Sequence, residues 1–121
     1  DCCVIGLNYR DRQKLYDRID KRVHVMMEKG LLDEIRQLIA MGYSSTAAQA
    51  IGYKEFFDYL EGKGSLDEAI AKVQMESRRY AKRQLTWFRR NPEMNWLTRR
   101  EGEDFSEILC RAGQLACQFD K

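Results

Sequence analysis

Pro92 is the only proline among the 121 residues, and it lies late in the chain. Proline removes a backbone donor and clashes with the preceding helical turn, so a long stretch without proline permits uninterrupted helices. That stretch is rich in Leu, Met, Glu, Lys, Arg and Gln, which favour helix. We therefore predict a mainly α-helical chain.

Glycines, hydroxyl residues and the spacing of apolar residues place the expected helices. Gly30 and Gly42 follow the first two helices, because a left-handed residue after a helix costs least at glycine. Ser65 and Glu68 form a capping box for the longest helix, which ends before Pro92 because proline disfavours helix at the residue preceding it. Apolar residues recur every three or four positions in these segments. The expected helices span residues 11–29, 31–41, 45–50, 53–60, 65–90 and 105–119.

A short apolar run at residues 2–7 precedes the first expected helix. It is typical of a buried strand, but a lone strand leaves its backbone hydrogen-bonding groups without partners. We expect one strand remnant of a larger α/β protein, followed by helical hairpins or a helical bundle. Residues 98–104 are expected to be a polar connection.

The longest predicted helix carries a basic strip. Its seven basic residues cluster on an arc of about 140° at 100° per residue, and Glu76 is the only acid among them. Such a strip suits a polyanion, since phosphate contacts release counterions and arginine binds phosphate in bidentate geometry. The strip comprises Lys72, Arg78, Arg79, Lys82, Arg83, Arg89 and Arg90.

Two alternatives to a polyanion partner remain open for this strip. The strip can be a solvated face paired with acids from neighbouring helices. A membrane surface fits less well, because Gln74, Ser77 and Gln84 interrupt the opposite side. Gln84 either has a buried partner or faces a ligand, and Trp87 and Phe88 are expected to be core residues rather than base-stacking platforms.

Other residue classes limit the functions to consider. The net charge of +2 does not by itself imply nucleic acid. The four cysteines form no C-x-x-C pair and are far in sequence from the only histidine, so a metal site is not expected and free thiols are. No leader and no apolar run near about 18 residues is visible. We expect a soluble, cytoplasmic protein without membrane contact.

Several collinear motifs over about residues 4–97 resemble the C-terminal portion of the tRNA dimethylallyltransferases, the IPP transferase family. Each motif is weak alone, and together they are highly specific. The motifs are Ile5-Gly6-Leu7, Arg22-Val23, Met27-Glu28-Lys29-Gly30-Leu31, Gln49-Ala50-Ile51-Gly52-Tyr53-Lys54-Glu55, Ser65-Leu66-Asp67-Glu68-Ala69-Ile70, Arg78-Arg79-Tyr80-Ala81 and Lys82-Arg83-Gln84-Leu85-Thr86-Trp87-Phe88-Arg89.

The resemblance implies transfer of a dimethylallyl group from dimethylallyl diphosphate to N6 of the adenosine 3′ to the tRNA anticodon. The family's P-loop-type α/β core holds the diphosphate and Mg²⁺, and its catalytic aspartate lies in the portion N-terminal to this stretch. No G-x-x-x-x-G-K-[ST] motif occurs here, so we expect no catalytic residue, no metal ligand and no activity from this chain alone. The full-length enzyme is expected to be a monomer.

The resemblance also assigns candidate contacts with the anticodon stem-loop. Lys54 is expected to bind phosphate, while Tyr53 either packs or stacks on a base. Arg18 and Arg22, one helical turn apart, could reach the diphosphate or form a structural surface pair. His24 replaces a frequent acid and is expected at the surface. The candidate tRNA-binding residues are Gln49, Ala50, Ile51, Gly52, Tyr53, Lys54, Lys82, Arg83, Gln84, Leu85, Thr86, Trp87, Phe88 and Arg89.

This interpretation divides the chain into a strand remnant at 1–10, a helical tRNA-binding portion at 11–97 and an amphipathic helix at 98–121. Two different functions remain possible from the sequence. One is a stand-alone helical RNA-binding module, and the other is a protein-interaction module whose basic strip docks on an acidic partner.

Overall fold

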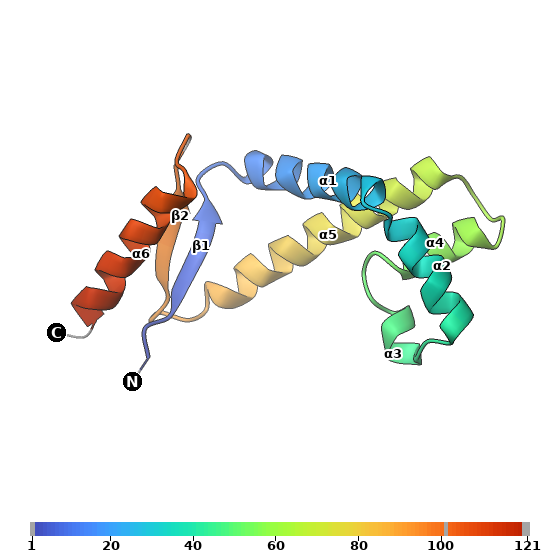
Figure 1. Cartoon of the computed structure of the whole chain (residues 1–121). Coiled ribbons are helices and arrows are strands. Elements are labelled where there is room, and N and C mark those ends of the chain that lie inside the picture. Colours follow the sequence, from blue (N-terminus) through green and yellow to red (C-terminus); the bar gives the residue numbers. More distant parts are fainter. Residues whose placement is uncertain (1, 101, 120–121) are drawn as a thin grey trace. The chain divides into compact units, whose positions relative to one another are not determined.

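The computed structural model describes residues 2–100 and 102–119. The elements follow the order β1 (Ile5–Tyr9), α1 (Arg12–Glu28), α2 (Leu31–Met41), α3 (Ser45–Ala48), α4 (Lys54–Leu60), α5 (Leu66–Phe88), β2 (Asn95–Arg99) and α6 (Phe105–Phe119) (Figure 1). The prediction of a mainly helical chain is confirmed, and the predicted helix boundaries hold to within a few residues.

Two compact units share these elements. One comprises residues 2–15, 82–100 and 102–119, and the other is Tyr16–Ala81. The unit boundaries fall inside α1 and α5, so these two helices contribute to both units. The division expected from the sequence, at residues 10/11 and 97/98, stays a prediction; β2 crosses the second of those boundaries.

Local capping explains where the helices begin. The Asp11 carboxylate accepts a hydrogen bond from the Gln13 amide at 2.9 Å before α1. At the start of α5 the predicted capping box is confirmed. The Glu68 amide donates to the Ser65 hydroxyl at 3.1 Å, and the Ser65 amide donates to the Glu68 carboxylate at 3.3 Å. Each bond satisfies a backbone donor that the first helical turn leaves without a partner.

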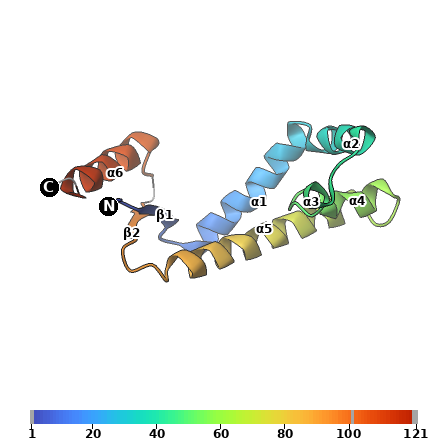
Figure 2. The same ribbon diagram turned by 90° about the horizontal axis from the view of Figure 1, so that it is seen from below.

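The helical unit is built around a core to which α1, α2, α4 and α5 each contribute. Val23, Ile35, Phe56 and Val73 are at most 1% exposed, and Ala69 lies beside them. Burying one large apolar side chain stabilises a folded chain by about 1.5–3 kcal/mol. Figure 2 shows these helices from below, with α4 leading through a short loop into α5.

Polar contacts align α1 and α5 within this unit. Arg78 donates to the Asp20 carboxylate, and Gln74 donates to the Asp20 carbonyl at 3.2 Å. The Gln74 amide nitrogen also lies 3.1 Å from Nε2 of His24, which is exposed as predicted. Since residues later in α1 meet residues earlier in α5, the two helices run antiparallel.

A second strand is the main correction to the predicted fold. β1 does not stand alone: it pairs in parallel with β2, with Ile5 opposite Asn95 and Tyr9 opposite Arg99. The region expected to be a polar connection from residue 98 therefore begins inside a strand. Parallel strands need a long crossover between them, so the partner of β1 lies far away in sequence. Gly6 allows close pairing, because a Cβ there would lie 2.8 Å from the Trp96 ring.

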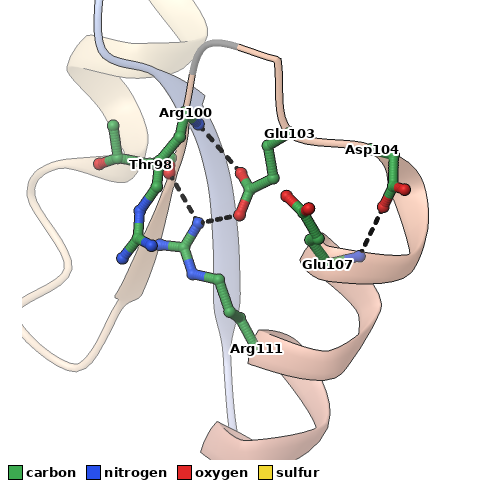
Figure 3. Close-up of polar contacts among 6 residues, drawn as sticks. All are labelled: Thr98, Arg100, Glu103, Asp104, Glu107 and Arg111. Atoms are coloured by element: carbon green, nitrogen blue, oxygen red, sulfur yellow. Dashed lines mark hydrogen bonds and ion pairs between the residues drawn. The ribbon is translucent and has the colours of Figure 1, made fainter.

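A buried ion pair fastens the loop between β2 and α6. Glu103 accepts hydrogen bonds from the Arg100 amide at 2.9 Å and from Arg111 at 2.7 Å (Figure 3). Arg111 also donates to the Thr98 carbonyl of β2 at 3.0 Å, so one guanidinium joins α6 to the strand. The Arg100 amide, followed by Arg111, lowers the pKa of Glu103 below its ordinary value.

None of the helices within residues 2–100 and 102–119 combines the length and the apolar character that crossing a membrane requires.

Candidate nucleic-acid interface

The C-terminal end of α5 and the two residues after it expose a basic cluster, which we define as Lys82, Arg83, Arg89 and Arg90. All four side chains are exposed. A groove of about 290 Å³ lies here, and its lining brings three of these cations together with a hydroxyl and an indole ring. The lining residues are Lys82, Arg83, Thr86, Trp87 and Arg90. Leu85, on the same turns, is buried.

Trp87 and Phe88 contradict the expectation that they are core residues. Trp87 is 65% exposed and Phe88 is 45% exposed. The Arg90 guanidinium lies 5.6 Å from the centre of the Trp87 ring, within the range of a cation–π contact. An exposed indole among cations is a surface on which a nucleobase can stack, whereas a buried indole is not.

Gln84 is exposed as well. This excludes the alternative in which a buried partner satisfies its amide, so within this chain Gln84 is available to a ligand or to water. Thr86 donates its hydroxyl proton to the Lys82 carbonyl at 3.0 Å, which leaves the hydroxyl oxygen as an acceptor. The exposed end of α5 thus offers amide, hydroxyl, indole and cationic groups on adjacent turns.

The earlier part of the basic strip is different. Arg78 is only about one-third exposed and pairs with Asp20 of α1, and Arg79 pairs with Glu76 at 3.0 Å. For Arg78 the alternative of a face paired with acids from neighbouring helices is right, whereas Arg79 pairs with an acid of its own helix. The predicted strip of seven basic residues is therefore not uniform, and the surface that suits a polyanion is the exposed basic cluster rather than the whole helix.

The second predicted stretch, Gln49–Lys54, forms the turn between α3 and α4. Its backbone turns at Gly52, where φ is +96°. Tyr53 packs against the helical core, and its hydroxyl donates to the Glu34 carboxylate at 2.8 Å. This hydrogen bond raises the pKa of Tyr53 above its ordinary value. Tyr53 therefore packs, while Lys54 is exposed and open to an anion.

The buried carboxylate of Glu55 contacts the same turn. Glu55 is 9% exposed, and its Oε2 accepts from the Gly52 amide at 2.9 Å. Its Oε1 is buried and has no hydrogen-bond partner among the described residues. A buried polar atom without a partner costs about 1–3 kcal/mol, so the structure tolerates a penalty at this position. The sequence did not single out Glu34 or Glu55 as functional residues.

The remaining candidates occupy separate places. Arg18 and Arg22 lie one turn apart on α1 and are exposed, and their predicted role toward a diphosphate stays a prediction. The two stretches predicted to bind tRNA belong to different compact units, Gln49–Lys54 to one and Lys82–Arg89 to the other. Among residues 2–100 and 102–119, no three His, Cys, Asp or Glu side chains converge to hold a metal ion.

Comparisons with known proteins agree with the motifs. The sequence model of the family described as IPP transferase matches residues 1–91. A tRNA dimethylallyltransferase of Acetivibrio thermocellus is 50% identical over 108 residues, which are 88% of this chain and 34% of the relative. A tRNA dimethylallyltransferase of Bacillus cereus is 50% identical over 110 residues, again 34% of its length. This chain thus spans about a third of the curated relatives it matches.

Solved structures show the same fold. The full-length tRNA isopentenylpyrophosphate transferase of Bacillus halodurans superposes with a TM-score of 0.83 and 43% identity, over 97% of this chain and 40% of that chain. The tRNA delta(2)-isopentenylpyrophosphate transferase of Staphylococcus epidermidis gives a TM-score of 0.88 and 37% identity, over 98% and 38% respectively. The described fold therefore corresponds to about two-fifths of these structures.

Proposed function

Because the chain belongs to the IPP transferase family, we propose that it is the C-terminal part of an enzyme that transfers a dimethylallyl group from dimethylallyl diphosphate to N6 of the adenosine 3′ to the tRNA anticodon. Within that enzyme this part supplies contacts with the anticodon stem-loop. The names of the relatives support the reaction class, and the basic cluster supports the role within it. The cytoplasmic location and the monomeric state stay predictions.

The basic cluster is the observation on which the RNA-binding role depends. Lys82 and Arg83 are exposed on the last turns of α5, and Arg89 is exposed directly after its last residue, Phe88. Phosphates recur along an RNA strand, so cations on a rigid helix can bind several phosphates without reorganising. The exposed Trp87 ring and the Gln84 amide beside them add groups that contact bases.

The turn Gln49–Lys54 is proposed to contact RNA beside the adenosine that is modified. Lys54 would bind phosphate, and the exposed side chains of Gln49 and Ile51 would contact the RNA, whereas Gly52 is buried within the turn. Enzymes that modify a base must hold the nucleic acid in a form that exposes that base. Tyr53 supports the turn rather than stacking, because its ring is packed and its hydroxyl is engaged by Glu34.

Catalysis is assigned to the rest of the enzyme. No three His, Cys, Asp or Glu side chains converge among the described residues, and Mg²⁺ is proposed to bind in the other part of the enzyme. A magnesium ion, the phosphate-binding loop and the catalytic aspartate remain part of the proposal for the longer protein only. We therefore propose that this chain binds RNA but transfers no dimethylallyl group by itself.

Substitution of Lys82 and Arg89 tests the RNA-binding role. The Lys82→Ala and Arg89→Ala variants should each weaken binding to an anticodon stem-loop about tenfold, because a hydrogen bond to a charged group contributes about 1.5 kcal/mol. Each should also reduce the slope of log K against log salt by about one. Fluorescence anisotropy of a labelled stem-loop across a salt series measures both quantities.

Lys29→Ala is the matched control, since it removes one exposed positive charge directly after α1 and outside both predicted stretches. Its affinity and salt slope should stay close to those of the parent chain. Equal effects from all three substitutions would mean a general charge effect rather than a defined cluster. If polyglutamate displaces the labelled stem-loop as effectively as unlabelled RNA does, an acidic protein partner is favoured instead.

A further inference from the structure

The turn Gln49–Lys54 is held by a side chain from a distant helix. Glu34 belongs to α2, 19 positions before Tyr53, and its Oε1 accepts the Tyr53 hydroxyl at 2.8 Å. On the other side of the turn, Oε2 of Glu55 accepts the Gly52 amide at 2.9 Å. Two adjacent residues of the turn are therefore fixed by two carboxylates.

The position of Glu34 is unfavourable on electrostatic grounds alone. Its carboxylate is exposed and lies beside a turn that carries Lys54 and is proposed to meet RNA phosphates. A negative charge there repels a polyanion, so simple electrostatics predicts that removing Glu34 strengthens RNA binding. A contribution of Glu34 to binding must instead come from geometry.

Geometry matters at this turn because it includes a backbone conformation that favours glycine. Gly52 has φ +96° and no Cβ, and glycine has more conformational freedom to lose than any other residue. The Tyr53 and Lys54 amides donate to the Ala50 carbonyl at 3.1 and 3.4 Å, and the two carboxylate contacts add to these restraints. A turn that is already ordered before RNA arrives avoids the entropy of ordering it on binding. The hydrogen bond to Glu34 raises the pKa of Tyr53 above its ordinary value.

We propose that Glu34 is a positioning residue for RNA recognition, acting through the Tyr53 hydroxyl to hold the turn Gln49–Lys54 in its binding conformation. This inference rests on the proposed function, since it assigns a role within the same RNA interface. It goes beyond that function by naming an acidic residue, outside both predicted stretches, as necessary for binding a polyanion.

The test measures binding of the 121-residue chain to an anticodon stem-loop at a temperature at which the chain is folded. Circular dichroism verifies the folding of each variant. Tyr53→Phe removes only the hydroxyl, and Glu34→Ala removes the acceptor. Each should weaken binding about three- to tenfold, the cost of ordering one side chain or turn on association. The double variant should be no weaker than either single variant, because both remove the same hydrogen bond.

Two further variants separate positioning from charge and from folding. Glu34→Gln keeps an acceptor oxygen and should restore binding to at least the level of the parent chain. Asp33→Ala is the matched control: it removes the neighbouring exposed acid, which pairs with Arg36 rather than with the turn. Its binding should be unchanged or slightly tighter, and the salt slope should be unaltered in the Glu34 and Tyr53 variants.

Tighter binding by Glu34→Ala, equal to that of Asp33→Ala, would overturn the proposal, because Glu34 would then act only through its charge. If Tyr53→Phe binds as the parent chain does, the hydroxyl has no positioning role and the proposal also fails. In both cases Lys82→Ala still weakens binding, and the proposed function stands. Absence of binding by the folded parent chain would instead remove the proposed function and this inference together.

Discussion

At the scale of single residues, Gly52 determines the path of the turn between α3 and α4. Its φ of +96° lies in the left-handed region, which costs other residues about 1–2 kcal/mol. No heavy atom lies within 4 Å of a Cβ built there, so the cost of a side chain is conformational rather than steric. Gly52→Ala should therefore lower the free energy of unfolding by about 1–2 kcal/mol, measured by urea denaturation.

Gly113 provides the opposite case within the same chain. It lies inside α6, its φ is not positive, and a Cβ there meets no atom within 4 Å. Gly113→Ala should raise the free energy of unfolding by about 0.5–1 kcal/mol, because alanine loses less conformational entropy in a helix. Destabilisation by Gly113→Ala, or tolerance of Gly52→Ala, would contradict this account of the two glycines.

At the scale of elements, the loop from β2 to α6 depends on ionised Glu103. Its pKa is lowered in the folded chain by the Arg100 amide and by Arg111. A lowered pKa contributes stability that is fully present above the unfolded value of 4.5 and is lost as the pH falls through the folded value. We expect the free energy of unfolding to fall more steeply below pH 4.5 in the parent chain than in Glu103→Gln.

Urea denaturation at a series of pH values measures this difference. Glu93→Gln serves as the control, because Glu93 is exposed, precedes β2 and is not part of the ion pair between Glu103 and Arg111. The pH dependence of Glu93→Gln should match that of the parent chain. A Glu103→Gln variant with the same acid sensitivity as the parent would show that Glu103 does not hold α6.

Helices were predictable from the sequence because their signals are local. Ser65 and Glu68 lie three residues apart and cap α5 as predicted, and Gly30 and Gly42 follow α1 and α2. β2 was not predictable in this way. Its partner β1 is about 90 positions earlier, as the Ile5–Asn95 pair shows, and no local pattern in Asn95–Arg99 specifies that pairing.

The candidate site was predictable only in part. The basic residues of α5 were found from their spacing, but the sequence could not distinguish Arg78, which pairs with Asp20 of α1, from the exposed Lys82. Burial of Trp87 was predicted wrongly, because burial depends on what packs against a helix and not on the residue alone. Glu34 was missed, since its bond with Tyr53 arises from the packing of α2 against the turn.

At the scale of the whole molecule, the chain should bind RNA without modifying it. Incubated with tRNA and labelled dimethylallyl diphosphate, it should incorporate no label above background, while the longer Bacillus cereus relative serves as the positive control. The reason is that this chain spans 34% of that relative and carries no phosphate-binding loop motif. Incorporation by the isolated chain would show that its own residues suffice for transfer.

We propose that this chain binds tRNA through the basic end of α5. To test this, the matching third of the Bacillus cereus relative is replaced with this chain, and the steady-state kinetics of transfer are measured. We expect an active chimera in which Lys82→Ala and Arg89→Ala raise KM for tRNA about tenfold each and leave KM for dimethylallyl diphosphate unchanged. An active chimera whose KM for tRNA is unaffected by either substitution would contradict it.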